Sequence, residues 1–396
     1  MTTSPTTSPA PPFCTAKSLV FIALFMTVIW LPLLDSFLHL DPTPQQNEKR
    51  ALVAFPKLTP TAEGARQFFI GVEKYYGDHF GFRNWLVRRH NRWKRQWFQE
   101  SPLPDVMQGQ DGWYFFAGSN MIENVTGHTQ FDDATLRDWR DLLESRRAWL
   151  AERGIAYLFV IPPDKHTVYP EYLPSWIKPA KSPTKLSQFL TYMKANSTVP
   201  IVDLRSVLIQ SKERERVYQF TDTHWTPEGG FVTYQEVLRA LAAQIPGIAP
   251  VDTEEFTRTY TIQPGGDLAK LLGQDNLVER DLVQLTPRSP LEGVATTNDT
   301  EIYPKAWPAM TEPMITVNPH ASGTAILFRD SFAGSWQPFL SYHFNRTIYI
   351  WDYHWNPELI ERERPQVVID EVLERFLNFE DPKKLMIEDG LDTHRS

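Results

Sequence analysis

Residues 328–334 read Phe-Arg-Asp-Ser-Phe-Ala-Gly and place a serine, Ser331, shortly after an apolar run. That run, residues 324–328 (Thr-Ala-Ile-Leu-Phe), has the length and composition of a buried strand. Open α/β sheets bind their ligands beyond the carboxyl ends of their strands. Ser331 is therefore a candidate nucleophile at the edge of an α/β sheet.

A candidate base for this serine lies upstream, in residues 221–230, which read Thr-Asp-Thr-His-Trp-Thr-Pro-Glu-Gly-Gly. A serine hydroxyl is a weak nucleophile until a base takes its proton, and an imidazole is a dependable base when a carboxylate fixes its tautomer. Taken alone, a serine after a strand is usually a turn residue, and a single histidine is usually structural. The two motifs together favour a catalytic triad of Ser331, His224 and Asp222.

Composition excludes several other classes of protein. The chain has 396 residues and a formal net charge of -8, which argues against a general nucleic-acid binder. Its single cysteine, Cys14, excludes an intramolecular disulfide and a thiolate metal cluster. The ten histidines are scattered without the spacing of a zinc motif, so we predict neither a metal nor a cofactor.

The N-terminus carries a membrane signal. Residues 1–17 read as a disordered tail, and residues 18–34 are apolar and uncharged before Asp35. Because this run lacks the small-residue cleavage site of a signal peptide, we predict an uncleaved transmembrane anchor over residues 18–40, with the rest of the chain outside the inner membrane. A linker is expected over residues 41–60.

The remainder reads as one α/β domain over residues 61–380, with a parallel sheet flanked by helices. Helices are expected at residues 133–153 and 228–244, and strands at residues 155–161, 199–204, 324–328, 347–351 and 366–369. Thr226 and Pro227 have the residue types of a helix N-cap and a first helical position. Residues 246–320 are expected to form an irregular excursion, and residues 381–396 a polar tail.

Six segments together are similar to one known family. They are residues 76–83, 111–115, 163–170, 222–225, 328–332 and 365–375. In their order and spacing the chain resembles the AlgX/AlgJ-like polysaccharide O-acetyltransferases, whose catalytic domain is SGNH-hydrolase-like. The sequence differs from ordinary SGNH hydrolases in two ways. Its serine follows the Asp-x-His motif instead of preceding the histidine, and Arg329 stands where glycine usually precedes Asp-Ser.

The resemblance implies an SGNH-hydrolase-like fold and assigns the nucleophile to Ser331, with His224 and Asp222 as base and orienting acid. It implies transfer of acetyl groups to hydroxyls of an exopolysaccharide, as in alginate biosynthesis, in the periplasm. A separate multi-pass membrane acyltransferase of the MBOAT type would deliver the acetyl group. An esterase of the same fold and a non-catalytic anchored scaffold are the alternatives.

Other residues are candidates for binding the substrate or the oxyanion. Besides the Ser331 amide, Arg329 could stabilise the oxyanion, and Lys165 and Tyr169 could line the substrate cleft. Aromatic residues that could stack on sugar rings are Trp225, Trp336 and Trp355. Residues 352–355 (Asp-Tyr-His-Trp) form a second Asp-x-His-Trp motif. It is less favoured as the catalytic one, because it follows Ser331 closely and opens no comparable helix.

Overall fold

The computed structural model describes residues 16–38, 40, 53–83, 85, 86, 89, 105–180, 183–274, 276–290, 292–298 and 313–391. The chain divides into two compact units, residues 1–99 and residues 100–396. Each unit is described by itself. The linker expected over residues 41–60 lies largely outside the described residues.

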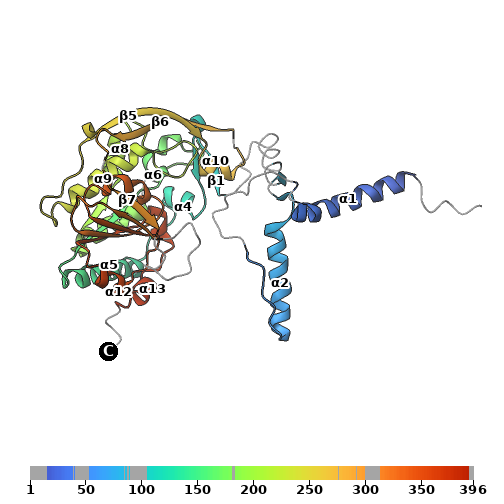
Figure 1. Cartoon of the computed structure of the whole chain (residues 1–396), viewed down its shortest axis with the longest axis horizontal. Coiled ribbons are helices and arrows are strands. Elements are labelled where there is room, and N and C mark those ends of the chain that lie inside the picture. Colours follow the sequence, from blue (N-terminus) through green and yellow to red (C-terminus); the bar gives the residue numbers. More distant parts are fainter. Residues whose placement is uncertain are drawn as a thin grey trace, which may run out of the picture. The chain divides into compact units, whose positions relative to one another are not determined.

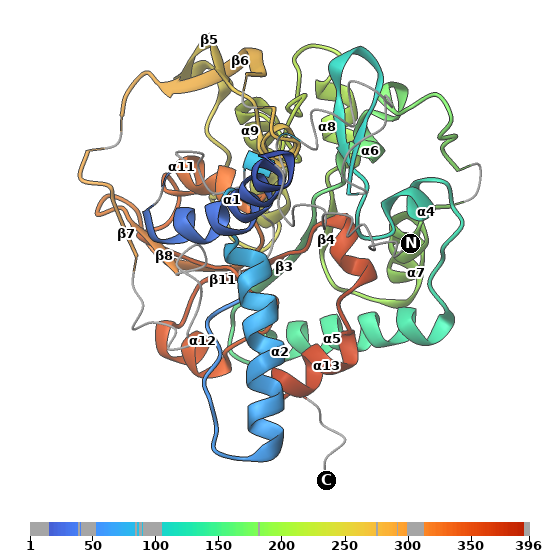
Figure 2. The ribbon, with the colours of Figure 1, turned by 90° about the vertical axis from the view of Figure 1, so that its right-hand side faces the viewer.

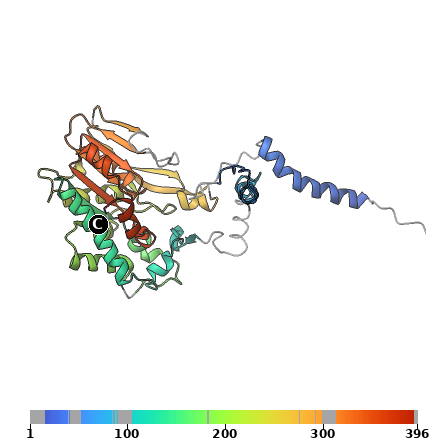
Figure 3. The ribbon, with the colours of Figure 1, turned by 90° about the horizontal axis from the view of Figure 1, so that it is seen from below.

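The described residues of the N-terminal unit include the helices α1 (Ala16–Leu38) and α2 (Ala62–His79), both blue in Figure 3. Helix α2 begins where the Thr61 side chain accepts the Gly64 N–H (2.9 Å), as an N-cap does. Residues 18–38 of the transmembrane segment predicted over residues 18–40 lie in α1. Among the residues that the structure describes, however, no helix has both the length and the apolarity needed to cross a bilayer. The predicted transmembrane helix is therefore not confirmed.

The second unit is built on a seven-stranded sheet. Its order is β4 (Ile201–Asp203), β3 (Ala156–Ile161), β11 (Val367–Glu371), β9 (Thr324–Phe328), β10 (Arg346–Ile350), β8 (Met314–Val317) and β7 (Ala295–Asn298). The strands from β4 to β10 are parallel, whereas β8 and β7 join antiparallel at one edge. The predicted α/β class is right, but the sheet is mixed. Short edge strands lack the continuous apolar run that identifies a central parallel strand.

Helices cover both faces of this sheet (Figure 1). One face packs on α8 (Arg205–Ser211) and α9 (Pro227–Leu241), and the other on α5 (Asp133–Ala151), α7 (Lys185–Asn196), α12 (Pro357–Glu363) and α13 (Pro382–Glu388). Successive residues of β3 alternate between the two cores: Leu158 joins the first and Phe159 the second. Burial on both sides explains why the central strand β3 consists of apolar and aromatic residues.

The segment expected to be irregular, residues 246–320, contains regular structure in its described part. Strands β5 (Phe256–Pro264) and β6 (Val278–Pro287) form an antiparallel ribbon that rises at one side of the unit (Figure 2), with helix α10 (Asp267–Leu271) between them. Strands β7 and β8 come from the same segment. The prediction was wrong because most of β5 is exposed, so the segment lacks an apolar alternation.

The predicted polar tail over residues 381–396 is also corrected. Helix α13 begins at an Asp381 cap, and Leu385 and Leu391 are buried. Helix α13 packs against α5, and Lys383 lies 3.2 Å from the Asp138 carboxylate. A short helix with only two buried apolar side chains has too weak a periodicity to stand out among charged residues. Residues 392–396 lie outside the described residues.

Candidate active site

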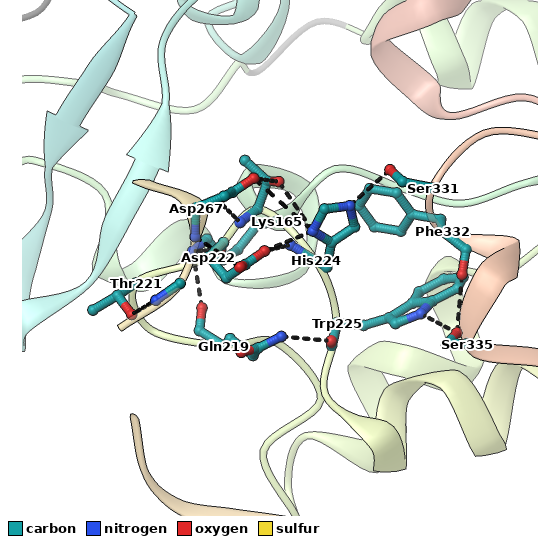
Figure 4. Close-up of polar contacts among 12 residues, drawn as sticks. Lys165, Gln219, Thr221, Asp222, His224, Trp225, Asp267, Ser331, Phe332 and Ser335 are labelled. Atoms are coloured by element: carbon teal, nitrogen blue, oxygen red, sulfur yellow. Dashed lines mark hydrogen bonds and ion pairs between the residues drawn. The ribbon is translucent and has the colours of Figure 1, made fainter. Parts of the chain in front are cut away.

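The structure brings Ser331, His224 and Asp222 together, as Figure 4 shows. Ser331 follows the carboxyl end of the central strand β9, and the other two lie in the loop that precedes α9. His224 Nε2 is 2.7 Å from Ser331 Oγ, and its Nδ1 is 2.6 Å from Asp222 Oδ1. The Thr226 hydroxyl accepts the Gly229 N–H (3.2 Å) and fixes the start of α9 directly after this loop. The imidazole is thus held between a hydroxyl and a carboxylate.

The surroundings of Asp222 keep it ionised. Burial alone would raise the pKa of the Asp222 carboxyl, but hydrogen bonds from the His224 ring and the backbone amides of His224 and Asp267 hold that pKa below its ordinary value. An ionised carboxylate at Nδ1 leaves Nε2 free to take a proton from the serine. Such an arrangement can activate a hydroxyl for attack on an ester.

The same groups have the spacing of a metal site. Asp222, His224 and Asp267 each present a ligand atom within 4.8 Å of the others. Both His224 ring nitrogens already face hydrogen-bond partners, so a metal ion could bind only by breaking the contact with Asp222 or with Ser331. The geometry therefore fits proton transfer better than metal ligation.

The turn that carries Ser331 is fixed by Asp330. Its carboxylate accepts the Phe332 N–H (2.8 Å), the Tyr353 hydroxyl (2.7 Å) and the Leu373 N–H (3.1 Å), and its own N–H donates to Glu371 (2.8 Å). These bonds connect the turn to the ends of β10 and β11. Asp330 thus positions the turn after β9 rather than facing the triad.

Arg329, a predicted oxyanion donor, also supports this turn. Its N–H donates to the Ile350 carbonyl (2.9 Å), and its guanidinium donates to the Asp330 carbonyl (2.9 Å) and lies over the Trp351 ring. The backbone amide of Arg329 is therefore already used. The Ser331 N–H, by contrast, donates no hydrogen bond to another described residue.

Lys165 is buried, which corrects the prediction that it lines a substrate cleft. Only 2 % of the residue is exposed, and its Nζ donates to the carbonyls of Gln219 (2.9 Å), Phe220 (3.3 Å) and Asp222 (2.6 Å). An ammonium group has three protons, and this one directs them to three carbonyls of a single loop. Lys165 therefore holds the triad loop from its backbone side (Figure 4).

The aromatic residues predicted to contact sugar rings are also buried. Trp336 is 0 % exposed and donates to Thr233 (3.0 Å), while Trp225 is 3 % exposed and donates to Ser335 (2.5 Å). Tyr169 accepts the Val217 N–H (3.0 Å), and Trp355 lies within the second core. Of these side chains, Trp225 and Trp336 stack on each other in the first core, and Trp225 also contacts Phe332, which follows Ser331. Their ring faces pack against other core side chains and are therefore unavailable to a ligand. Their polar atoms find hydrogen-bond partners inside the protein, as those of buried Tyr and Trp residues usually do.

The second Asp-x-His-Trp motif has a different environment. His354 Nδ1 is 2.8 Å from Asp352, in the same relation as His224 to Asp222, but its Nε2 is 2.5 Å from the Glu388 carboxylate of α13. Glu388 thus occupies the place of a hydroxyl that a histidine base would activate. The structure therefore favours the first motif as the acid–base pair.

Sequence reasoning missed Asp267, which lies beside the triad at the start of α10. Its N–H donates to Asp222 Oδ2 (2.8 Å), and its carboxylate binds Thr223. The available signal was the glycine pair at residues 265 and 266 directly before an aspartate. A β-carbon at Gly266 would lie 2.3 Å from Asp222 Cβ, so only glycine allows the two segments to approach so closely.

A family model and a solved structure define the fold class of the second unit. Residues 106–302 match the family model described as the SGNH hydrolase-like domain of the acetyltransferase AlgX. This segment includes Asp222, His224 and Asp267, whereas Ser331 lies beyond it. The solved structure of Bacillus cereus PatB1 shares the fold, with a TM-score of 0.53 and 19% identity over 71% of this chain and 99% of that one. The second unit is thus an SGNH-hydrolase-like α/β domain.

Two curated relatives indicate more narrowly which proteins the chain resembles. The chain is 28% identical over 224 residues to a probable alginate O-acetylase AlgJ of Pseudomonas fluorescens, covering 56% of this chain and 54% of that protein. It is 27% identical over 226 residues to a probable alginate O-acetylase AlgJ of Azotobacter vinelandii, with coverages of 56% and 54%. The chain thus spans about half the length of these curated relatives. The predicted resemblance to the AlgX/AlgJ-like O-acetyltransferases is confirmed.

Proposed function

We propose that this protein is a polysaccharide O-acetyltransferase that moves an acetyl group through a Ser331 acyl-enzyme onto a hydroxyl of an exopolysaccharide in the periplasm. The observation that carries the proposal is the hydrogen-bonded line from Asp222 through His224 to Ser331. The similarity to alginate O-acetylases supports transfer over hydrolysis and a uronic-acid polymer such as alginate as acceptor.

The first half of the reaction acylates the enzyme. His224 Nε2 takes the proton of Ser331 Oγ as that oxygen attacks the acetyl carbonyl, and Asp222 stabilises the imidazolium that forms. The Ser331 N–H is the first candidate donor to the oxyanion of the tetrahedral intermediate. When the donor's C–O bond breaks, His224 returns its proton to the leaving oxygen. The acetyl ester of Ser331 remains.

The second half reverses these roles. A sugar hydroxyl gives its proton to His224 and attacks the acetyl carbon, and Ser331 leaves and recovers the proton. Transfer exceeds hydrolysis only when the sugar is held better than water, because a positioned group reacts at a high effective concentration. We further propose that a separate multi-pass acyltransferase of the MBOAT type supplies acetyl groups, as the resemblance implies.

The test is covalent labelling of the purified full-length protein with an activated acetyl ester, located by peptide mass spectrometry. We expect the acetyl group on Ser331, with labelling abolished by Ser331→Ala and slowed about a thousandfold or more by His224→Ala. The control is Ser206→Ala, since Ser206 is an exposed serine on α8. Added acetyl-free alginate oligosaccharide should shorten the life of the label and become acetylated.

Two results would contradict the proposal. Labelling that persists in Ser331→Ala would show that this serine is not the nucleophile. A label on Ser331 that is released as free acetate at the same rate with and without oligosaccharide would identify an esterase instead.

A further inference from the structure

Asp267 meets the triad from a segment far along the chain. It follows the ribbon strand β5 at the first position of α10, while Asp222 and His224 precede α9. Three backbone amides of this segment also bind Thr221: Gly266 donates to its hydroxyl (2.9 Å), and Leu268 and Ala269 donate to its carbonyl (3.0 and 3.1 Å). The segment is therefore attached to the triad loop directly before Asp222.

The two oxygens of Asp222 have separate partners. Oδ1 accepts from the His224 ring nitrogen (2.6 Å) and from the His224 amide (2.9 Å), while Oδ2 accepts the Asp267 N–H (2.8 Å). A carboxylate held at one oxygen alone can rotate about its Cβ–Cγ bond, because that torsion is broad. The Asp267 amide restrains this rotation and keeps Oδ1 directed at the imidazole.

The side chain of Asp267 completes the arrangement. Its Oδ1 accepts the Thr223 N–H (2.8 Å) and its Oδ2 accepts the Thr223 hydroxyl (2.6 Å), so it holds the residue between Asp222 and His224. Oδ2 also lies 4.0 Å from His224 Nδ1. A second negative charge at that distance favours the imidazolium formed during the reaction.

We propose that Asp267 is a positioning residue of the candidate active site, which acts on His224 through Asp222 and Thr223 and does not itself contact the substrate. The inference rests on the proposed function, because it needs His224 to be the base for Ser331. It assigns the segment between β5 and β6 a part in catalysis, where the sequence indicated only an excursion.

The main test compares Asp267→Asn with Asp252→Asn in the full-length protein. Asp252 is an exposed aspartate earlier in the same segment. Asparagine keeps the shape of Asp267 and removes its charge. We expect Asp267→Asn to slow acetyl labelling of Ser331 about 10- to 100-fold, as displaced catalytic groups do, with the final extent of labelling unchanged. In turnover of a small acetyl ester, kcat should fall while KM stays the same.

The rate and the final extent of acetyl labelling distinguish a positioning role of Asp267 from a role in folding. If fewer molecules become labelled but those that do react at the wild-type rate, Asp267 serves folding only. This result would overturn the inference. If Asp267→Asn does not fold, Thr223→Val replaces it. This variant keeps the side-chain shape but removes the hydroxyl bond, and we expect labelling to be about two- to tenfold slower. An unchanged rate in this variant contradicts the inference.

A double-mutant cycle tests the route of the effect. Adding Asp267→Asn to Asp222→Ala should slow labelling less than the same substitution slows the wild type, because one of the two groups through which Asp267 acts is already gone. Equal losses in both backgrounds would overturn the inference. Failure of the proposed function has a different signature, namely labelling that is independent of Ser331 and His224.

Discussion

At the scale of single residues, Lys165 shows how a charge can serve the site without facing it. Burial lowers the pKa of its ammonium group to about 7, against the opposing influence of Asp222, Asp267 and Glu279. The charged form is retained near neutral pH by three loop carbonyls. The sequence predicted a ligand contact because Lys165 follows the carboxyl end of a strand, where open α/β sheets bind their ligands.

This burial predicts a pH dependence of stability. Unfolded, Lys165 keeps its proton up to its ordinary pKa of 10.5, whereas in the folded protein it releases the proton near pH 7. Between these values the unfolded chain binds more protons, so the contribution of Lys165 to the free energy of unfolding rises with pH, by at most about 1.4 kcal/mol per pH unit.

The measurement is urea unfolding of the wild type and Lys165→Met at several pH values. The wild type should gain stability relative to the variant as the pH rises above about 7. Lys194→Met, at an exposed position on α7, is the control and should run parallel to the wild type. Parallel curves for Lys165→Met would contradict a lowered pKa.

Residue patterns predicted which side chains meet, but not which are exposed. Ser331, His224 and Asp222 were found because each lies beside a recognisable boundary, a strand end or a helix cap. Trp225 and Trp336 were misassigned because an aromatic residue near a motif has the same pattern whether its ring faces solvent or core. Asp267 was missed because its contact depends on a three-dimensional approach of two segments.

At the scale of secondary-structure elements, the second Asp-x-His-Trp motif joins the loop after β10 to helix α13. His354 lies between Asp352 and Glu388, and Trp355 donates to the Asp370 carboxylate of β11 (2.8 Å). The motif thus has a structural function at the C-terminal end of the sheet, on the face opposite to α9.

The substitution His354→Ala is predicted to show that His354 and His224 have different functions. Removing the imidazole breaks hydrogen bonds to two carboxylates, so the free energy of unfolding should fall by about 1–3 kcal/mol. Acetyl labelling of Ser331 in the variant, measured below its unfolding transition, should stay within about twofold of the wild type. A loss of labelling as large as that of His224→Ala would identify His354 as the base instead.

Buried secondary-structure elements were predicted from the sequence more accurately than exposed ones. Strand β9 has the predicted bounds, Thr324–Phe328, because an apolar run between turn residues has few other interpretations. The edge strand β7, its neighbour β8 and the exposed ribbon of β5 and β6 were not recognised. An exposed strand has little hydrophobic pattern, and its pairing is determined by backbone hydrogen bonds that every residue type can make.

At the scale of the whole second unit, a buried charged cluster connects α5, near its beginning, with β11 and the residues after α13. Arg146 on α5 donates to Asp370 of β11 (2.8 Å) and to Asp389 after α13 (2.7 Å), and all three residues are at most 2 % exposed. Burial raises the pKa of Asp370, and Arg146 opposes this rise. The Asp370 carboxylate therefore depends on Arg146 to remain ionised inside the protein.

This cluster predicts that the last described residues are essential for stability. A chain ending at Glu388 loses Asp389 and the buried Leu391, and leaves the Arg146 guanidinium without one of its two carboxylates. Removing one partner of a buried ion pair typically costs about 3–5 kcal/mol, because the remaining charge stays desolvated. We therefore expect this truncation to lower the urea midpoint strongly, whereas a chain ending at Leu391 should unfold like the full-length protein. Equal midpoints for the two truncations would show that Asp370 alone satisfies Arg146, and that the C-terminal residues add nothing to the stability of the unit that carries Ser331.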